Sequence, residues 1–402
     1  MRGKRHVEQM NDVTFWKHHD SSSPLTLTSQ TTPPPSCQCF PILVYVSTME
    51  SQKSEKNHEY SLRRSGRPFT KDYRVYFQRT TTTGKKSKTV PVSPWHDIPL
   101  YHDEERKIFN MVVEVPRWMN AKFEISRSKF LNPITQDLLD GEPRFTKNCF
   151  PYKGYIWNYG ALPQTWESPH FKNPATKHKG DNDPIDCCCI SSGPDSIAPT
   201  GSVLHVKVLG ILALIDQHET DWKLLAVDTS DKSFSKLNDI DDVEKQLPGL
   251  LDATRDWFRI YKVPDGESPN KYALDGKFKD KEYAMGVIYA CWEQWRDLVL
   301  GKEEAKGISI YNTTLKGTPG YLDPDDVDSQ LPPDEVLPPP DDDEEDARKA
   351  RLEEWFYIDR RALDDVCIDD SENDLGTGGA DEIIDCILGH DSELSIALDL
   401  ER

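Results

Sequence analysis

Long hydrophobic runs are missing from this 402-residue sequence. No apolar stretch approaches the ~20 residues that a membrane-spanning helix needs. The early apolar segment 40–46 is short and follows three prolines, so it is also a poor signal peptide. Residues 1–20 carry three acidic side chains beside their basic ones, which is unusual for a transit peptide. These absences predict a cytoplasmic protein without a membrane segment, and they leave a mitochondrial or nuclear location open.

The nine cysteines include no C-x-x-C pair, and Cys187, Cys188 and Cys189 are consecutive. Adjacent residues of an extended segment point to opposite faces, so such neighbours cannot easily form a network of disulfides. The pattern favours reduced thiols, as in a cytosolic protein.

The formal net charge of −20 is concentrated at one end of the chain. From Tyr321 to Arg402 there are 28 acidic and 6 basic residues, a net of −22, whereas the other 320 residues carry 41 acidic and 43 basic ones, a net of +2. A tail of this composition is usually solvated and flexible. It would also repel phosphate backbones, which argues against direct binding to nucleic acid.

Composition divides the chain into three regions. Residues 1–58 are rich in Ser, Thr, Pro and charge and show no sustained period, which predicts a disordered N-terminal extension. Met49 is either the working start of the protein or an internal residue behind a disordered N-terminus that is always present, and the two interpretations have equal weight. Residues 59–312 form the predicted folded domain. Residues 313–402 form a mostly disordered acidic tail, in which the apolar pair Trp355-Phe356 could dock on the domain.

Within the predicted domain, strand signals come first and helix signals come late. Strands are predicted at 73–77, 110–115, 122–125, 203–216 and 222–228. A helix is predicted at 241–258, with an interruption at Pro248, and another at 281–300. The second helix would place Ala284, Val287, Ile288, Cys291, Trp295 and Leu298 on one face. This order predicts an α+β fold with a β-barrel at its centre.

The densest group of acidic residues is Gly180-Asp181-Asn182-Asp183-Pro184-Ile185-Asp186. Three carboxylates in six residues repel one another unless a cation lies between them, and their oxygen atoms select Mg²⁺, Mn²⁺ or Ca²⁺. A calcium-binding EF-hand loop is a poor match, because its glycine and glutamate positions would be Asp186 and Ser192. Considered alone, the motif fits a solvated acidic turn about as well as a metal site.

A second acidic pair favours the metal site. Asp216 ends one predicted strand and Asp221 precedes the next, with a short hairpin loop at 217–220. A hairpin brings both carboxylates to the same end of the sheet. Lys223 would project from the same face as Asp221, and Lys122 and Glu124 repeat this spacing in another strand. A pair of this kind is often only a surface ion pair.

Basic and phenolic side chains accompany these carboxylates along the chain. Arg144 is followed by the aromatic run Phe150 to Gly160, and Tyr261-Lys262 precede a loop. Tyrosines at this density usually belong to a core, although a phenol can also donate a hydrogen bond to a phosphate oxygen. Acids and bases along the same strands suit a polyanion bridged by metal ions.

These residues resemble the soluble inorganic pyrophosphatases of the eukaryotic family I type. The resemblance covers roughly 70–300, with weaker traces near Trp355. The family motif D-x-D-P-[hydrophobic]-D is present at Asp181 to Asp186. Three further blocks support it in family order, namely Phe109 to Trp118, Asn158 to Glu167 and Glu219 to Lys223. The resemblance implies hydrolysis of pyrophosphate to two phosphates by an OB-like, five-stranded closed barrel with flanking helices, usually in a homodimer.

The resemblance also implies roles for particular residues and several Mg²⁺ ions, for which Mn²⁺ could substitute. Asp181, Asp186 and Asp221 would bind the first metal, and Asp186 would bridge to the second. Asp183 would accept a hydrogen bond from a nucleophilic hydroxide between them, and Asp216 and Glu124 would bind metals that arrive with the substrate. The implied phosphate ligands are Arg144, Lys122, Lys223, Tyr261 and Lys262. Tyr155 matches a proton donor, and Tyr159 and Glu114 match other active-site positions.

Two local features depart from the family pattern. Cys187 to Cys189 follow the aspartate motif where an acidic residue is common at the third position, and His218 replaces a glycine in the hairpin loop. Both termini are also longer than usual. The main alternative is a pyrophosphatase-like interaction subunit of a chromatin assembly with weak or no activity. A calcium-binding module and an OB-fold nucleic-acid binder fit less well, because lysines accompany the acids and the predicted groove is acidic.

Overall fold

The computed structural model describes residues 59–83, 85–191, 196–232, 235–338 and 352–360. The predicted N-terminal extension, 1–58, and most of the predicted acidic tail lie outside these ranges. No helix within them is long and apolar enough to cross a membrane.

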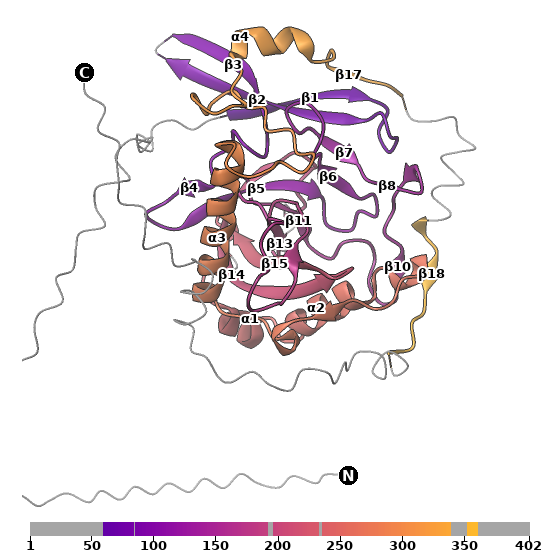
Figure 1. Ribbon diagram of the computed structural model, residues 1–402. Helices are drawn as coiled ribbons and strands as arrows, with labels where there is room; N and C mark the ends of the chain where they lie inside the picture. The colour runs from indigo at the N-terminus through magenta and orange to yellow at the C-terminus, as the bar shows by residue number, and fades with distance from the viewer. Residues whose placement is uncertain (1–58, 84, 192–195, 233–234, 339–351, 361–402) are drawn as a thin grey trace, which may run out of the picture. The chain divides into compact units, whose positions relative to one another are not determined.

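Five strands at the centre of the fold pair in a closed ring (Figure 1). Their order is β5 (Ile108–Val115), β11 (Asn158–Ala161), β13 (Asp186–Cys189), β15 (Glu219–Asp228) and β14 (Val203–Asp216), and β14 pairs back to β5. All neighbours are antiparallel except β13 and β15, which are parallel. At the edges, β12 (Lys179–Gly180) pairs with β15, β4 (Tyr101–Asp103) with β5, and β16 (Lys271–Tyr272) with β14. The strands predicted at 110–115, 203–216 and 222–228 all lie in this ring.

The ring strands are rich in apolar residues, which lets both of their faces be buried. The consecutive cysteines show this directly, since Cys187 and Cys189 pack in one hydrophobic cluster and Cys188 packs in another. All three are fully buried free thiols, as the alternation of an extended segment predicts.

The helices pack against the ring in two different hydrophobic clusters. α3 (Lys281–Val299) supplies Ala284, Val287, Ile288 and Cys291 to the first cluster. α1 (Ile240–Gln246) and α2 (Leu250–Ile260) supply Val243, Trp257 and Phe258 to the second. The predicted face of α3 is confirmed, because all six of its residues are buried. The predicted helix 241–258 is two helices, which meet at Gly249 with φ +87°.

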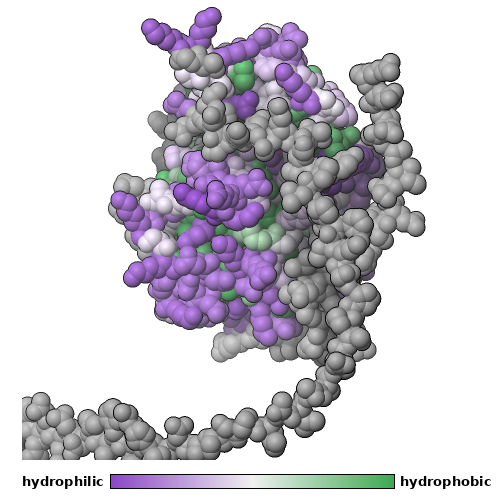
Figure 2. Space-filling model, turned by 90° about the vertical axis from the view of Figure 1, so that its left-hand side faces the viewer, coloured by the Kyte–Doolittle hydropathy of each residue, from purple (hydrophilic) through white to green (hydrophobic). Residues whose placement is uncertain are grey.

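A second sheet is built mainly from segments in the first part of the chain. Its strands are β1 (Glu59–Gly66), β2 (Arg74–Thr83), β3 (Lys86–Val92), β6 (Phe123–Ile125), β7 (Ile134–Gln136) and β17 (Glu335–Val336), in the order β17-β1-β2-β7-β6 with β3 beside β2. The first strand therefore begins at Glu59, well before the predicted strand 73–77. On the side of the molecule seen in Figure 2, hydrophilic side chains cover most of the described surface, and hydrophobic ones show in smaller patches between them.

Residues 313–338, which follow the predicted end of the domain at 312, continue the folded body. Thr313 and Thr314 donate hydrogen bonds to the buried Asp97, and Val327 and Leu331 pack against Leu131. The predicted docking pair forms β18 (Trp355–Phe356), parallel to β10 (Asn148–Cys149). The remaining short elements are β8 (Leu138–Leu139), β9 (Glu142–Pro143), α4 (Pro324–Val327) and the 3-10 turns η2 (Val263–Asp265), η3 (Leu274–Gly276) and η4 (Asp328–Gln330).

Candidate active site

One cavity of about 520 Å³ collects all fourteen residues that the sequence and the family resemblance singled out. The carboxylates are Glu114, Glu124, Asp181, Asp183, Asp186, Asp216 and Asp221, and the bases and phenols are Lys122, Arg144, Tyr155, Tyr159, Lys223, Tyr261 and Lys262. They come from β5, β6, β11, β13, β14, β15 and the connecting loops. Segments up to about 150 residues apart in the sequence thus meet at one opening, as the topology of the ring requires.

The aspartate loop is held in shape by hydrogen bonds of its own. The N–H of Asp183 donates to Asp181 Oδ1 at 3.0 Å. Asn182 has φ +73°, and its side-chain oxygen accepts a bond from the Trp166 indole at 3.0 Å. A short polar side chain that bonds locally tolerates this left-handed conformation. The turn therefore presents Asp181 and Asp183 to the cavity.

Lys223 lies between two carboxylates. Its ammonium group contacts Asp186, donates to Asp221 Oδ1 at 2.5 Å and to the Tyr159 hydroxyl at 3.0 Å, and is only 4% exposed. The parallel pairing of β13 and β15 places Asp186 opposite Lys223, and the two-residue spacing places Asp221 on the same face. The predicted shared face of Asp221 and Lys223 is confirmed by this contact.

The β14–β15 hairpin brings Asp216 and Asp221 to one end of the ring, as predicted. Its turn consists of Gln217 and His218, with φ +48° and +68°, and Asp216 pairs with Glu219. The position that carries a glycine in the family pattern thus has a positive φ in this chain.

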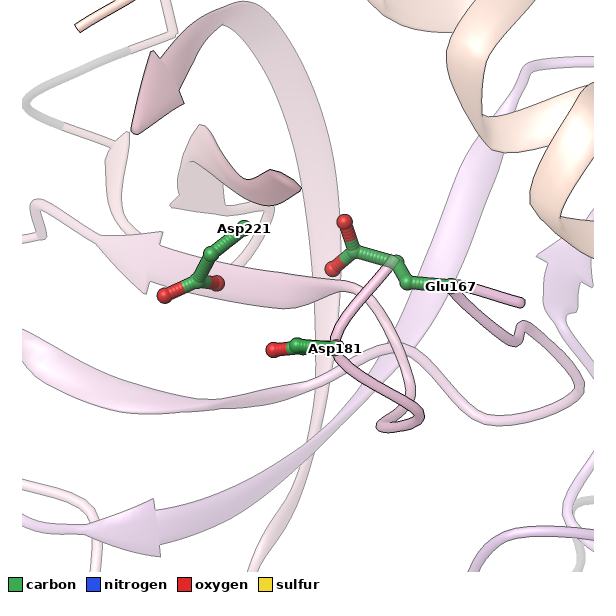
Figure 3. A group of neighbouring side chains, drawn as sticks. All are labelled: Glu167, Asp181 and Asp221. Carbon is green, nitrogen blue, oxygen red and sulfur yellow. The ribbon is translucent and has the colours of Figure 1, made fainter. Parts of the chain in front are cut away.

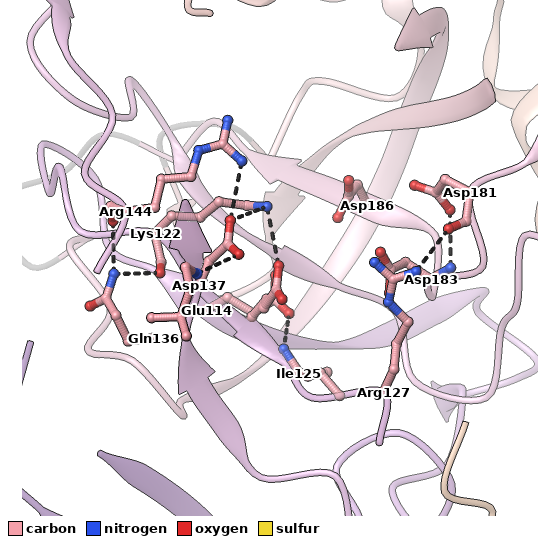
Figure 4. A network of polar contacts seen from close by, with 12 residues as sticks. Glu114, Lys122, Ile125, Arg127, Gln136, Asp137, Arg144, Asp181, Asp183 and Asp186 are labelled. Carbon is pink, nitrogen blue, oxygen red and sulfur yellow. Dashed lines mark hydrogen bonds and ion pairs between the residues drawn. The ribbon is translucent and has the colours of Figure 1, made fainter. Parts of the chain in front are cut away.

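Two groups of basic side chains line the cavity, and Figure 4 shows the group around Lys122 and Arg144. In that group, Asp137 Oδ2 lies 3.1 Å from both Lys122 Nζ and Arg144 Nη1, and Lys122 also contacts Glu124 at 3.1 Å. In the other group, the carboxylate of Asp216 accepts from Lys262 at 2.5 Å and from the Tyr261 hydroxyl at 3.2 Å.

Two further predicted residues form the buried wall of the cavity. Glu114 accepts a hydrogen bond from the Ile125 N–H at 2.6 Å. The ring of Tyr155 packs against those of Tyr159 and Trp257, with centroids 5.1 Å and 4.9 Å away. Burial raises the pKa of the Tyr155 phenol, so this hydroxyl stays protonated at neutral pH.

Three carboxyl groups of the cavity, those of Asp181, Asp183 and Asp221, are hard to ionise in the absence of a further positive charge. Burial raises the pKa of Asp183 and of Asp221 to about 7, even though the charges of Arg127 and Lys223 oppose the shift. Burial and the neighbouring charge of Asp221 raise the pKa of Asp181 well above its usual range. A divalent cation would stabilise the ionised forms.

The donor set fits a hard divalent cation. One carboxylate oxygen from each of Glu167, Asp181 and Asp221 lies within 4.8 Å of the other two. Figure 3 shows these three side chains from close by. Carboxylate oxygens are the ligands that Mg²⁺ and related ions prefer. The residues present therefore fit a site for such an ion.

Three charged residues that contact or lie beside the predicted site residues were not singled out from the sequence. Arg127 Nε lies 3.1 Å from Asp183 Oδ1, Asp137 joins Lys122 to Arg144, and Glu167 lies beside Asp181 and Asp221. Glu167 ends one of the blocks that resemble the family, and this was the one signal that could have pointed to it. The roles of Arg127 and Asp137 depend on packing between distant segments.

A cavity that joins buried carboxylates to lysine, arginine and tyrosine side chains is typical of enzymes that transfer phosphoryl groups with the help of divalent cations. A protein-family model described as Inorganic pyrophosphatase matches residues 111–296 of this sequence. The inorganic pyrophosphatase of Neurospora crassa is 49% identical over 300 residues, which cover 75% of this chain and 97% of that protein. The enzyme of Candida albicans is 54% identical over 265 residues, covering 66% and 88%. The chain belongs to the inorganic pyrophosphatase family.

Solved structures agree with this assignment. The inorganic pyrophosphatase of Schistosoma japonicum has a TM-score of 0.65 at 40% identity, and the similarity covers 75% of this chain and all of that one. A truncated vacuolar soluble pyrophosphatase of Trypanosoma cruzi, solved in complex with PPi, has a TM-score of 0.55 at 37% identity and covers 68% and 99%. None of these relatives supports the alternative of a chromatin-associated interaction subunit.

Proposed function

We propose that this protein hydrolyses inorganic pyrophosphate to two phosphate ions and that it uses Mg²⁺, with Mn²⁺ as a substitute. The observation that carries the proposal is the single cavity in which buried carboxylates face lysine and arginine side chains. Carboxylates alone would suit a metal store, and bases alone would suit an anion site. Carboxylates and bases together suit a polyanion that binds together with metal cations.

The first Mg²⁺ would be held by Asp181, Asp186 and Asp221, and the second would also be reached by Asp186. The ions that enter with the substrate would be held by Asp216 and Glu124. When bound, Mg²⁺ supplies neutralisation of the diphosphate oxygens and lowers the pKa of coordinated water. In the structure, Lys223 contacts Asp186 and Asp221, and Lys262 contacts Asp216. These ammonium groups compensate the negative charge of the proposed metal ligands, and both lysines line the cavity in which an anion would bind.

Asp183 would orient the attacking water by accepting a hydrogen bond from it. Its main chain is fixed because its N–H donates to Asp181, and its carboxylate is held because Arg127 contacts its Oδ1. A base that is held in this way can align a water with the phosphorus atom opposite the bridging oxygen. The loss of Asp183 would therefore affect the chemical step more than cation binding.

The cationic and phenolic groups would bind the phosphate oxygens and the leaving group. The phosphate oxygens would be held by Lys122, Arg144, Lys223, Tyr159, Tyr261 and Lys262. Glu114 would support Lys122 and the second sheet from the buried wall of the cavity. As the bond between phosphorus and the bridging oxygen breaks, the buried phenol of Tyr155 would donate a proton to that oxygen, which leaves with the second phosphate.

The fold and assembly expected from the resemblance belong to the same proposal. We assign the closed ring of five strands to the OB type of barrel, because one parallel pair closes an otherwise antiparallel Greek-key ring. We also propose a homodimer located in the cytoplasm. Light scattering of the purified protein should give twice the 46.0 kDa chain mass, and a monomeric mass would contradict the dimer.

The substrate can be tested by ³¹P NMR of the full-length protein. With Mg²⁺, the pyrophosphate resonance should be replaced by that of phosphate alone. Under the same conditions ATP should lose its phosphates much more slowly. An unchanged pyrophosphate resonance would contradict the proposed function.

A further inference from the structure

Glu167 lies beside the proposed cation site without a part in the reaction described above. It belongs to the segment between β11 and β12 and is 3% exposed. One of its carboxylate oxygens lies within 4.8 Å of an oxygen of Asp181 and of an oxygen of Asp221. Figure 3 shows the three carboxylates beside one another, with those of Asp181 and Asp221 directed to the same side.

Hydrogen bonds fix Glu167 to both of the segments that carry the two aspartates. Its N–H donates to the Asp183 carbonyl at 2.8 Å, and its own carbonyl accepts from the Asn182 N–H at 2.9 Å. Its Oε1 accepts from the Trp222 N–H, next to Asp221, at 3.0 Å. The close approach requires Gly180, since a Cβ there would lie 2.3 Å from the Glu167 main chain.

The other carboxylate oxygen, Oε2, is buried and has no hydrogen-bond partner among the described residues. A buried oxygen without a partner costs roughly 1–3 kcal/mol. Two kinds of partner are compatible with the surroundings. One is the cation site itself, and the other is a single water in the small cavity of about 20 Å³ behind Glu167, which Ser168 and Gln294 also line.

We propose that Glu167 is a positioning residue of the cation site, a third carboxylate whose free oxygen supports the ion held by Asp181 and Asp221. The inference rests on the proposed function, since it assumes that these aspartates bind a divalent cation. Mg²⁺ usually keeps several waters in its shell, and such waters donate hydrogen bonds to nearby carboxylates. Glu167 is held where it can accept one while its Oε1 keeps β15 in place.

The test is Mg²⁺ binding to the full-length protein at pH 8, measured by isothermal titration calorimetry without pyrophosphate. Glu167→Gln keeps an acceptor for the Trp222 N–H and removes only the charge. We expect it to weaken Mg²⁺ binding about tenfold without lowering the thermal midpoint in EDTA, because it relieves repulsion among three carboxylates. Glu282→Gln, on the exposed first turn of α3, is the matched control and should bind Mg²⁺ as the unmodified protein does.

Unchanged Mg²⁺ binding in Glu167→Gln would overturn the inference and would leave Glu167 as a support for Trp222 and a buried water. If that variant does not fold, Glu167→Asp keeps the charge but withdraws the carboxylate, and binding as tight as in the unmodified protein would again overturn the inference. The proposed function fails separately, if the unmodified protein binds Mg²⁺ but leaves pyrophosphate intact.

Discussion

The protonation of Asp183 and Asp221 links cation binding to pH. Burial places the pKa of both carboxyl groups at about 7 in the folded protein, whereas the same groups in an unfolded chain have a pKa of roughly 4. Between these values the folded state binds more protons than the unfolded state. Without metal, stability therefore falls as the pH rises toward and through 7.

We expect Mg²⁺ to bind at least about fourfold more weakly at pH 6.5 than at pH 8, because the carboxyl group of Asp221, a proposed ligand that is mostly protonated at the lower pH, must ionise first. The rise in thermal midpoint on adding Mg²⁺ should accordingly be larger at pH 8, and the midpoint in EDTA should be lower at pH 8 than at pH 6.5. Scanning calorimetry at the two pH values checks both. Equal rises at both pH values would show that these groups are already ionised at pH 6.5.

Lys223 provides a second test at this scale. Its ammonium group is buried between Asp186 and Asp221, and removing one partner of a buried pair leaves charge without compensation. Lys223→Met should therefore lower the free energy of unfolding by about 3–5 kcal/mol in EDTA at pH 8. The loss should be smaller with Mg²⁺, which compensates the same carboxylates.

Urea denaturation measures both values. Lys302→Met, which removes an exposed ion pair with Asp297, serves as the control and should change stability by less than about 1 kcal/mol. A loss for Lys223→Met that is the same with and without Mg²⁺ would mean that the ion does not occupy this part of the cavity.

At the scale of elements, the register of the β14–β15 hairpin decides whether the acidic residues converge. The pairing of Asp216 with Glu219 and of Leu214 with Asp221 directs both aspartates to one end of the ring. A shift of one residue would turn every side chain of one strand to the opposite face. The two-residue turn at Gln217 and His218 holds this register, although both residues have positive φ.

Replacing His218 by glycine should therefore stabilise the protein. A residue with a Cβ loses roughly 1 kcal/mol in the left-handed region, and glycine does not. We expect His218→Gly to gain about 0.5–1 kcal/mol and to keep its activity, because the hydrogen bond with His178 uses the main-chain carbonyl and only a tilted ring contact, with centroids 6.3 Å apart, is lost. Urea denaturation and a phosphate-release assay check this pair of outcomes. A loss of stability would show that the His218 side chain contributes more than its backbone strain costs.

Elements with a strong local pattern could be predicted from the sequence. The bounds of β14 and the buried face of α3 follow from alternation and from a 3.6-residue period. β1 could not be predicted in this way. Its sequence, EYSLRRSG, has few apolar residues, and its support comes from distant partners such as β17 and the Arg63–Asp328 ion pair.

The site shows the same division. The acidic motif and the hairpin predict a metal-binding region, because their geometry is local. Arg127, Asp137 and Glu167 became visible only in three dimensions. Asp137, for example, reaches Lys122 and Arg144 because the Gln136 amide also bonds to the carbonyls of those two residues and draws their strands together.

At the scale of the whole molecule, residues 313–338 are part of the folded body. Asp97 is buried and accepts hydrogen bonds from Thr313 and Thr314, and Val327 is fully buried beside Leu131. None of the described residues 313–338 or 352–360 lines the active-site cavity. Their contribution is therefore to stability.

A chain that ends at residue 338 should keep close to full activity, whereas one that ends at residue 312 should lose at least about 4 kcal/mol of stability. The shorter chain leaves the carboxylate of Asp97 without its threonine donors and uncovers Leu131. Thermal denaturation and phosphate release of both truncated proteins test this difference. Equal stability of the two would show that the packing of residues 313–338 is dispensable.

The central claim is that the buried aspartates and the cations they hold carry out the hydrolysis of pyrophosphate. The most direct measurement is phosphate release from pyrophosphate by the purified full-length protein and by Asp183→Asn, each with Mg²⁺ and with EDTA. The account predicts rapid release only for the unmodified protein with Mg²⁺, and a rate lower by at least about 100-fold for Asp183→Asn, with its fold intact. Release that is no faster from the unmodified protein than from Asp183→Asn would contradict it.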